Sequence, residues 1–274
     1  MEFKAWLEKI KLNSIKIQFD EDDCEELPIG SSKFGGFPDL PQDFNWYYYR
    51  GESIKDNSYL SRPLSFLVQF NCEDLKVYDL EHVLPERGML YFFYEFESET
   101  WGFDAKDIGS ARVYYYDGDL NHLVRTSPPS DLKEEYIFPE IKIDLSHVDS
   151  YPDMEDVSSI LPRSFFHDYD QLYYNQLEDN SSKLLGYPEN IQGELLGLCE
   201  FVTNEKDTPV KRKESEDDLT IKPYDWRLLL QLDTVYKDGF MLMFGDGGRI
   251  YFCIKESDLK QRNFDKIWLI LQCY

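Results

Sequence analysis

Cysteine and histidine are scarce in this sequence, and their spacing is not that of a metal site or a disulfide framework. The chain contains five cysteines and four histidines, which are Cys24, Cys72, Cys199, Cys253, Cys273, His82, His122, His147 and His167. No two cysteines form a CxxC pair, and no histidine lies beside a cysteine. Metal sites and disulfide scaffolds usually need such clustering. We therefore expect reduced thiols, and the sequence predicts no metal site and no cofactor.

Long apolar runs and basic residues are also in short supply. No segment approaches the roughly 18 apolar residues that a membrane-spanning helix needs, and residues 1–20 carry charges throughout, unlike a signal peptide. Lysine and arginine number 29 against 53 acidic residues, which gives a net charge of −24. This charge disfavours nucleic-acid and membrane binding, because both surfaces are anionic. It favours encounter with a basic protein, although an acidic surface that only keeps the protein soluble has the same composition. We expect a cytoplasmic location.

Aromatic residues, by contrast, are abundant, with 20 tyrosines and 19 phenylalanines among the 274 residues. Their flat rings pack well on pleated sheets. Strand and turn patterns dominate the chain, and helical spacing is confined to a few segments. We predict a mainly β (α+β) fold: a single compact domain over 1–274 with a few peripheral helices.

Two short segments of the sequence are closely similar. Residues 31–44 read SSKFGGFPDLPQDF and residues 181–194 read SSKLLGYPENIQGE, with six identities in fourteen positions. Further matches follow in the same order: LSFLVQFN at 64–71 with WRLLLQLD at 226–233, and GMLYFF with GRIYFC. The offset between the paired segments increases from the first match to the second. We attribute this increase to an inserted surface loop, the charged segment 204–218. Ordered matches indicate duplication, with repeat one at about 31–130 and repeat two at about 181–274.

Each repeat combines a glycine–proline turn with an apolar strand that carries a glutamine. The runs FLVQF and LLLQL have no water-facing side, so we predict strands buried on both faces. A buried amide must be paired, and turn backbone is the usual partner. Gln69 and Gln231 are therefore interpreted as brackets that tie turn to strand, and a ligand contact is the alternative.

Local patterns outside the matched segments predict several further elements. Apolar spacing favours a short helix at about 2–11 followed by a strand, and a second helix within 158–182. Asp-Gly turns favour hairpins at 112–125 and around 244–248. The apolar end, 263–273, is interpreted as a final strand or helix.

The chain resembles the bacterial YwqG-like proteins of the DUF1963 family from about residue 31 to its end. The resemblance is carried by SKFGGFPDLP, FLVQF, GYPENIQGE, WRLLLQLD, FGDGGRIYFCIKESDL and NFDKIWLILQC. It implies one mostly β, internally duplicated fold, and it brings no known activity, cofactor or catalytic residue. Relatives occur near polymorphic toxin systems, which implies an immunity-like or toxin-associated role. They usually have a tryptophan before the GDxG turn, where this chain has Phe244.

No pattern in the sequence is typical of an enzyme active site. There is no nucleophile elbow, and the glycine-rich FGDGG lacks the lysine and helix of a phosphate loop. The sequence therefore predicts no catalytic residue. If a ligand binds, clefts between related halves are favoured sites. The candidate residues at such a site are Gln69, Trp226, Gln231, Asp233, Asp246 and Arg249.

Two functions from different classes are consistent with these patterns. The first is a non-enzymatic, immunity-like module that binds a basic protein, which the charge of −24 favours. The alternative is an enzyme or small-ligand sensor with its site in the cleft between the repeats. Nothing in the sequence predicts the oligomeric state.

Overall fold

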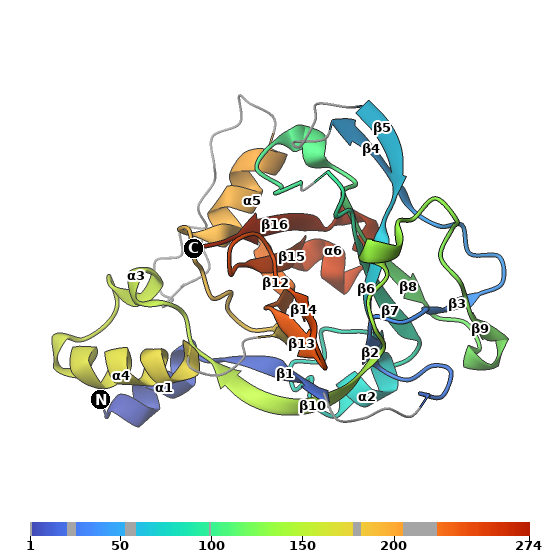
Figure 1. Ribbon diagram of the computed structural model, residues 1–274. Helices are drawn as coiled ribbons and strands as arrows, with labels where there is room; N and C mark the ends of the chain where they lie inside the picture. Colours follow the sequence, from blue (N-terminus) through green and yellow to red (C-terminus); the bar gives the residue numbers. More distant parts are fainter. Residues whose placement is uncertain (1, 21–25, 53–58, 99, 178–181, 205–223) are drawn as a thin grey trace.

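The fold is mainly β, as the sequence predicts, and its strands form one large sheet and three small ones (Figure 1). The computed structural model describes residues 2–20, 26–52, 59–98, 100–177, 182–204 and 224–274. The predicted loop at 204–218 lies outside the described residues, apart from Asn204. No helix in the described ranges is long and apolar enough to cross a bilayer.

The large sheet contains ten strands, and every neighbouring pair is antiparallel. In spatial order its strands are β16 (Trp268–Gln272), β15 (Arg249–Lys255), β12 (Trp226–Leu232), β11 (Lys183–Leu185), β1 (Leu12–Asp20), β10 (Ile141–Ser150), β2 (Lys33–Phe34), β6 (Ser65–Asn71), β7 (Met89–Tyr94) and β8 (Ala111–Tyr116). The long pair β1–β10 lies at the centre. We call β11, β12, β15 and β16 the C-terminal arm, and β2, β6, β7 and β8 the N-terminal arm.

The two arms follow the same pairing scheme on either side of the central pair. Lys33 of β2 pairs with Gln69 of β6, and Lys183 of β11 pairs with Gln231 of β12. Each glutamine strand then pairs with its next strand through a register shift, which lies at Leu67 in one arm and at Leu229 in the other. The segments matched in the sequence thus occupy matching places in the sheet.

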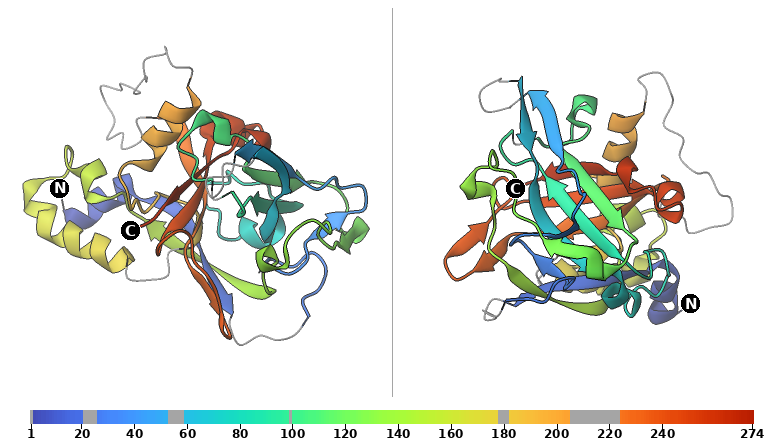
Figure 2. Two further views of the ribbon diagram at one scale, coloured as in Figure 1. Left: turned by 45° about the horizontal axis from the view of Figure 1, so that its top comes forward. Right: turned by 90° about the vertical axis from the view of Figure 1, so that its right-hand side faces the viewer.

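The arms face each other across the main hydrophobic core (Figure 2). Phe92 of β7 meets Phe252 of β15 edge to face, with ring centroids 5.2 Å apart. Alternate side chains of the same strands point the other way: Tyr91 packs in a cluster outside the N-terminal arm, and Tyr251 packs outside the C-terminal arm. Both β6 and β12 are therefore buried on both faces, which confirms that prediction.

The small sheets overturn one predicted hairpin and revise another. They pair β13 (Val235–Lys237) with β14 (Phe240–Leu242), β3 (Asp39–Pro41) with β9 (Leu123–Arg125), and β4 (Tyr48–Glu52) with β5 (Tyr59–Pro63). The hairpin predicted at 112–125 is wrong, because Asp119 caps a 3-10 turn that directs β9 away from β8 and onto β3. Around 244–248, Phe244 and Gly248 form a bridge, but β14 pairs with β13 and not with β15.

Helices are short and lie at the periphery. They are α1 (Phe3–Ile10), α2 (Cys72–Lys76), α3 (Met154–Val157), α4 (Phe166–Leu177), α5 (Leu195–Thr203) and α6 (Glu256–Lys260). Short 3-10 turns are η1 (Ala105–Asp107), η2 (Leu120–His122), η3 (Glu134–Tyr136), η4 (Arg163–Phe165) and η5 (Phe264–Lys266). The helices predicted within 2–11 and 158–182 are confirmed as α1 and α4, which pack together through Trp6 and Tyr169. The apolar end of the chain is a strand, β16.

Candidate functional site

A buried polar cluster lies on the C-terminal arm, centred on Glu189. The chain reaches this place through a sharp turn after β11, where Leu185 and Gly186 both have positive φ. Lys183 Nζ lies 2.6 Å from the Glu189 carboxylate, and Arg249 lies 3.7 Å from it. The Glu189 residue is only 2% exposed. Two cations thus surround one carboxylate in a place that water barely reaches.

Gln231 completes the cluster by holding the turn against the sheet. Its side-chain oxygen accepts from the Glu189 backbone N–H at 3.0 Å, and its amide donates to the Glu189 carboxylate at 3.3 Å. The Tyr251 hydroxyl donates to the Glu189 carbonyl at 2.7 Å. The amide therefore serves as a bracket between turn and strand.

The N-terminal arm carries a matching cluster centred on Asp39. The Asp39 N–H donates to Gln69 at 2.9 Å, the Gln69 amide donates back to the carboxylate at 2.8 Å, and the Tyr91 hydroxyl donates to the Asp39 carbonyl. Lys33 lies 4.0 Å from Asp39. Burial lowers the pKa of Lys33. The hydrogen bond that Lys33 donates to Glu140 and the negative charge of Asp39 oppose this effect. Acid, lysine, glutamine and tyrosine thus recur in both arms.

The arms differ in the source of their arginine. Arg125 arrives from β9 and donates to Asp39 at 2.9 Å, whereas Arg249 begins β15 and donates to Asp233 at 2.8 Å. Glu140, at the entry to β10, adds a second carboxylate to the N-terminal cluster, 2.5 Å from Lys33.

The structure brings together three of the six candidate residues. Gln231, Asp233 and Arg249 share the C-terminal cluster, while Gln69 belongs to the matching cluster of the other arm. Trp226 faces α5, where its indole N–H donates to Glu200 at 2.8 Å. Asp246 is exposed in the turn between Phe244 and Gly248. Ligand binding by these residues stays a prediction.

Sequence reasoning did not select the residues at the centres of the clusters. Asp39 and Glu189 were visible as a conservative match between the two similar sequence segments, and Lys33 and Lys183 as an identity. Acids and lysines near turns are ordinarily solvated, so these matches did not distinguish buried groups from surface ones.

The bracket geometry predicts that Gln231→Leu destabilises the protein by about 1–3 kcal/mol, because the Glu189 N–H would lose its buried acceptor. Urea unfolding of both proteins measures this loss. Gln192→Leu, at an exposed position of the same turn, is the control and should unfold like the wild type. A Gln231→Leu protein of unchanged stability would contradict the bracket and favour a ligand role.

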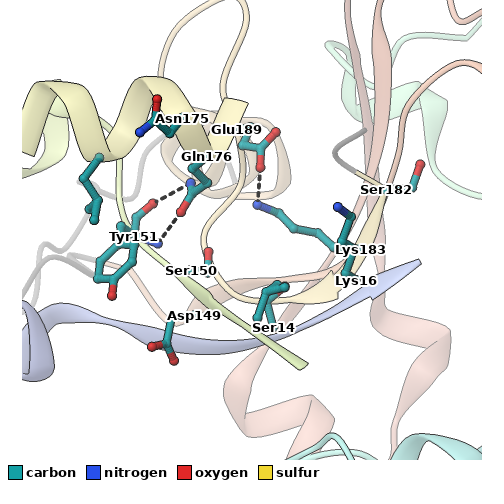
Figure 3. A pocket seen from close by; sticks show the side chains of 12 residues that line it. Ser14, Lys16, Asp149, Ser150, Tyr151, Asn175, Gln176, Ser182, Lys183 and Glu189 are labelled. Carbon is teal, nitrogen blue, oxygen red and sulfur yellow. Dashed lines mark hydrogen bonds and ion pairs between the residues drawn. The ribbon is translucent and has the colours of Figure 1, made fainter. Parts of the chain in front are cut away.

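A cavity of about 270 Å³ opens beside Lys183 and Glu189 (Figure 3). Its walls come from β1, β10, β11 and α4 and include Ser14, Lys16, Ser150, Tyr151, Asn175, Gln176 and Ser182. Several of these polar groups already serve the protein itself. Gln176 exchanges two hydrogen bonds with the Tyr151 backbone, and Ser150 accepts from the Tyr187 N–H at 2.9 Å.

A second cavity, of about 450 Å³, lies between the arms and includes Asp246 in its wall. The N-terminal side contributes Tyr94, Phe96, Trp101 and Tyr136, and the C-terminal side contributes Met243, Phe244, Gly245, Leu271 and Cys273. The rest of the contact between the arms is filled with apolar side chains. Among the described residues, the contact between the arms thus combines a packed apolar core with this cavity.

The thiols within the described ranges are buried. Cys72, Cys199, Cys253 and Cys273 are buried and unpaired, as expected for reduced thiols, and Cys24 lies outside the described residues. Burial raises the pKa of Cys72 to about 12, so its reactive thiolate is not formed near neutral pH. Within the described ranges, no three His, Cys, Asp or Glu residues are grouped so as to hold a metal ion.

Several carboxylates lie close together at α3. Burial, followed by the negative charges of Asp153 and Glu194, raises the pKa of Asp156 to about 7. A proton is therefore held by the folded state at pH values where the unfolded chain has released it. The resulting stabilisation is lost as the pH rises from about 4 to about 7.

Asp156→Asn should remove this pH dependence, because asparagine mimics the protonated acid. We expect the variant to melt several degrees above the wild type at pH 8, with a smaller difference at pH 5. Thermal unfolding at the two pH values measures both differences. Equal differences at both would show that Asp156 does not carry this proton.

Comparison with protein families gave a match over most of the chain. The family model described as a domain of unknown function (DUF1963) covers residues 32–273. The comparison with curated proteins gave no match.

Proposed function

The chain belongs to the DUF1963 family, and we propose that it is a non-enzymatic binding protein whose partner is a basic protein. We place it among the bacterial YwqG-like members of the family, in the cytoplasm, in an immunity-like role that masks a cationic surface. Its two arms are proposed to descend from a duplicated unit. The shared pairings and the shared clusters around Asp39 and Glu189 support that origin.

The distribution of charge carries the proposal. Buried charged residues in the described ranges are almost balanced, with five cations and four acids, which are Lys33, Arg62, Lys183, Arg227, Arg249, Asp39, Asp79, Glu95 and Glu189. The buried charged residues therefore do not contribute to the net charge of −24. The acidic residues that produce it lie elsewhere in the chain. Such a field accelerates encounter with a cationic protein and repels anionic ones.

Exposed side chains near the second cavity are of the kind that protein interfaces bury. Tyr236, Met241 and Met243 are 51%, 54% and 41% exposed on and beside the β13–β14 hairpin. Aromatic residues and methionine are enriched in interfaces, and they supply the apolar contact that charge alone lacks. Acidic steering and an apolar contact surface support a protein as the partner.

Affinity capture at low ionic strength tests the proposal. The full-length protein, immobilised, should recover a basic protein from a lysate of its own cells and release it as salt is added. The captured protein, once purified, should bind the purified chain with a defined stoichiometry. Failure to recover any basic protein, or recovery that salt does not reverse, would count against the proposed function.

The cavity beside Lys183 supports a second candidate, the sensing of a small polar ligand. Its walls combine hydroxyls, amides and a lysine–glutamate pair from four elements. A thermal-shift screen of polar metabolites tests this candidate. A ligand that stabilises the wild type should not stabilise Leu172→Trp, in which a larger side chain fills the cavity. If no compound raises the melting temperature of the wild type, this candidate fails.

A further inference from the structure

We propose that the cavity between the arms receives one cationic side chain, a lysine or an arginine, of the basic partner. This inference rests on the proposed function. It adds the site at which the protein would recognise a particular side chain of its partner. Three features support it: aromatic walls, a carboxylate in the wall, and acidic residues next to lining residues along the chain.

The aromatic walls come from both arms. Phe96 is central among them: its ring stacks on Tyr136 at 6.1 Å and on Phe244 at 6.2 Å, and meets Tyr94 edge to face at 4.8 Å. Trp101 lines the same cavity. Aromatic faces carry partial negative charge and attract ammonium and guanidinium groups within about 6 Å of the ring centre. A cavity walled by several rings is therefore suited to a cation with an apolar stem.

Asp246 supplies the full negative charge at this place. It sits in the turn that the Phe244–Gly248 bridge closes, so its backbone is held at the cavity wall. No lysine or arginine in the described ranges forms an ion pair with it. The carboxylate is thus available to a cation from outside, and it repels an anionic ligand.

Several acidic residues neighbour the lining residues along the chain. Glu134 and Glu135 are exposed in the turn that leads to Tyr136, and Glu97 follows Phe96. Glu97 is paired with Lys133 at 2.8 Å and with Arg62 at 3.8 Å, so these two basic side chains are already engaged by a carboxylate. The excess of carboxylates favours entry of a positive group.

The size of the cavity fits a long basic side chain. About 450 Å³ accommodates a whole lysine or arginine side chain and more. Met243 and Leu271 line it alongside the rings, and such apolar contacts suit the methylene stem of these residues. A neutral polar side chain would gain neither the cation–π attraction of the rings nor the charge–charge attraction of the carboxylate.

Titration of the full-length protein with two small probes tests the inference. The probes are Nα-acetyl-arginine amide and its neutral counterpart Nα-acetyl-citrulline amide, which have nearly the same shape. We expect the arginine probe to shift the NMR signals of the Trp101 indole and of Gly245 saturably, and the citrulline probe to bind at least about tenfold more weakly. Equal binding of the two probes, or no shift with the arginine probe, would overturn the inference.

Two variants and a matched control locate the site. Asp246→Asn should weaken the arginine probe about tenfold, and Trp101→Leu about three- to thirtyfold. Asp238→Asn removes the same charge from the nearby β13–β14 turn, outside the cavity, and should change affinity less than about twofold. Equal effects of Asp246→Asn and Asp238→Asn would show that only the overall field matters.

The captured partner separates this inference from the proposed function. If the partner binds wild type and Asp246→Asn equally well, the cavity is not its contact site, and the acidic binding function stands. If no basic partner binds, the function fails, and the probe titration still judges the cavity on its own terms.

Discussion

Glu189→Ala is expected to lower the free energy of unfolding by about 3–5 kcal/mol, a fall of about 10 °C in melting temperature. The substitution removes a buried carboxylate that lies 2.6 Å from Lys183 and 3.7 Å from Arg249. Both cations are nearly buried. Lys183 would lose its carboxylate partner where water cannot replace it, and Arg249 would keep Asp233, which lies 2.8 Å away. Chemical and thermal unfolding measure the loss.

The matched control for this prediction is Glu86→Ala. Glu86 also accepts from a lysine, Lys76, at 2.7 Å, but both side chains are about half exposed. A surface pair of this kind contributes at most about 1 kcal/mol. Asp39→Ala, in the matching cluster, should cost less than Glu189→Ala, because Glu140 still lies 2.5 Å from Lys33 and 3.5 Å from Arg125. If Glu189→Ala costs no more than Glu86→Ala, the cluster does not hold the turn.

Phe92→Ala and Phe252→Ala are each expected to cost about 3–5 kcal/mol, because each opens a cavity in the core between the arms. Both rings are fully buried, and they meet edge to face at 5.2 Å. Urea unfolding of the single variants and of the double variant measures the losses. The double variant should lose less than the sum, since the second truncation removes contacts that the first has already lost.

Phe201→Ala is the control for the core variants, because Phe201 on α5 is 72% exposed. It should change stability by less than about 0.5 kcal/mol. Strictly additive losses for Phe92 and Phe252, or a cost near that of Phe201→Ala, would mean that the arms are not held together through these rings.

The sequence predicted the elements that depend on local patterns. The apolar runs around Gln69 and Gln231 could only be strands buried on both faces, and an amide within such a run had to find turn backbone. The structure bears out both points. Amphipathic spacing was sufficient for α1, where Trp6, Leu7 and Ile10 form the buried face.

Local patterns could not predict which residues far apart in the sequence contact each other. Arg125 is 86 positions from Asp39 and reaches it through β9, a strand that local turn signals had assigned to a hairpin with 112–116. We predicted a cleft between the repeats. Apolar side chains of the same strands fill most of the contact between the arms, so little of that space is left for a cleft. The cavity that includes Asp246 lies beside this packed contact, and its place depends on how the arms pack.

The most direct test of the central claim is the rate of association between this protein and its captured basic partner, measured across ionic strength. We predict that the rate falls by at least about tenfold between 50 mM and 500 mM salt, because the acidic excess of the chain steers the encounter. A rate that stays constant over this range would contradict the account.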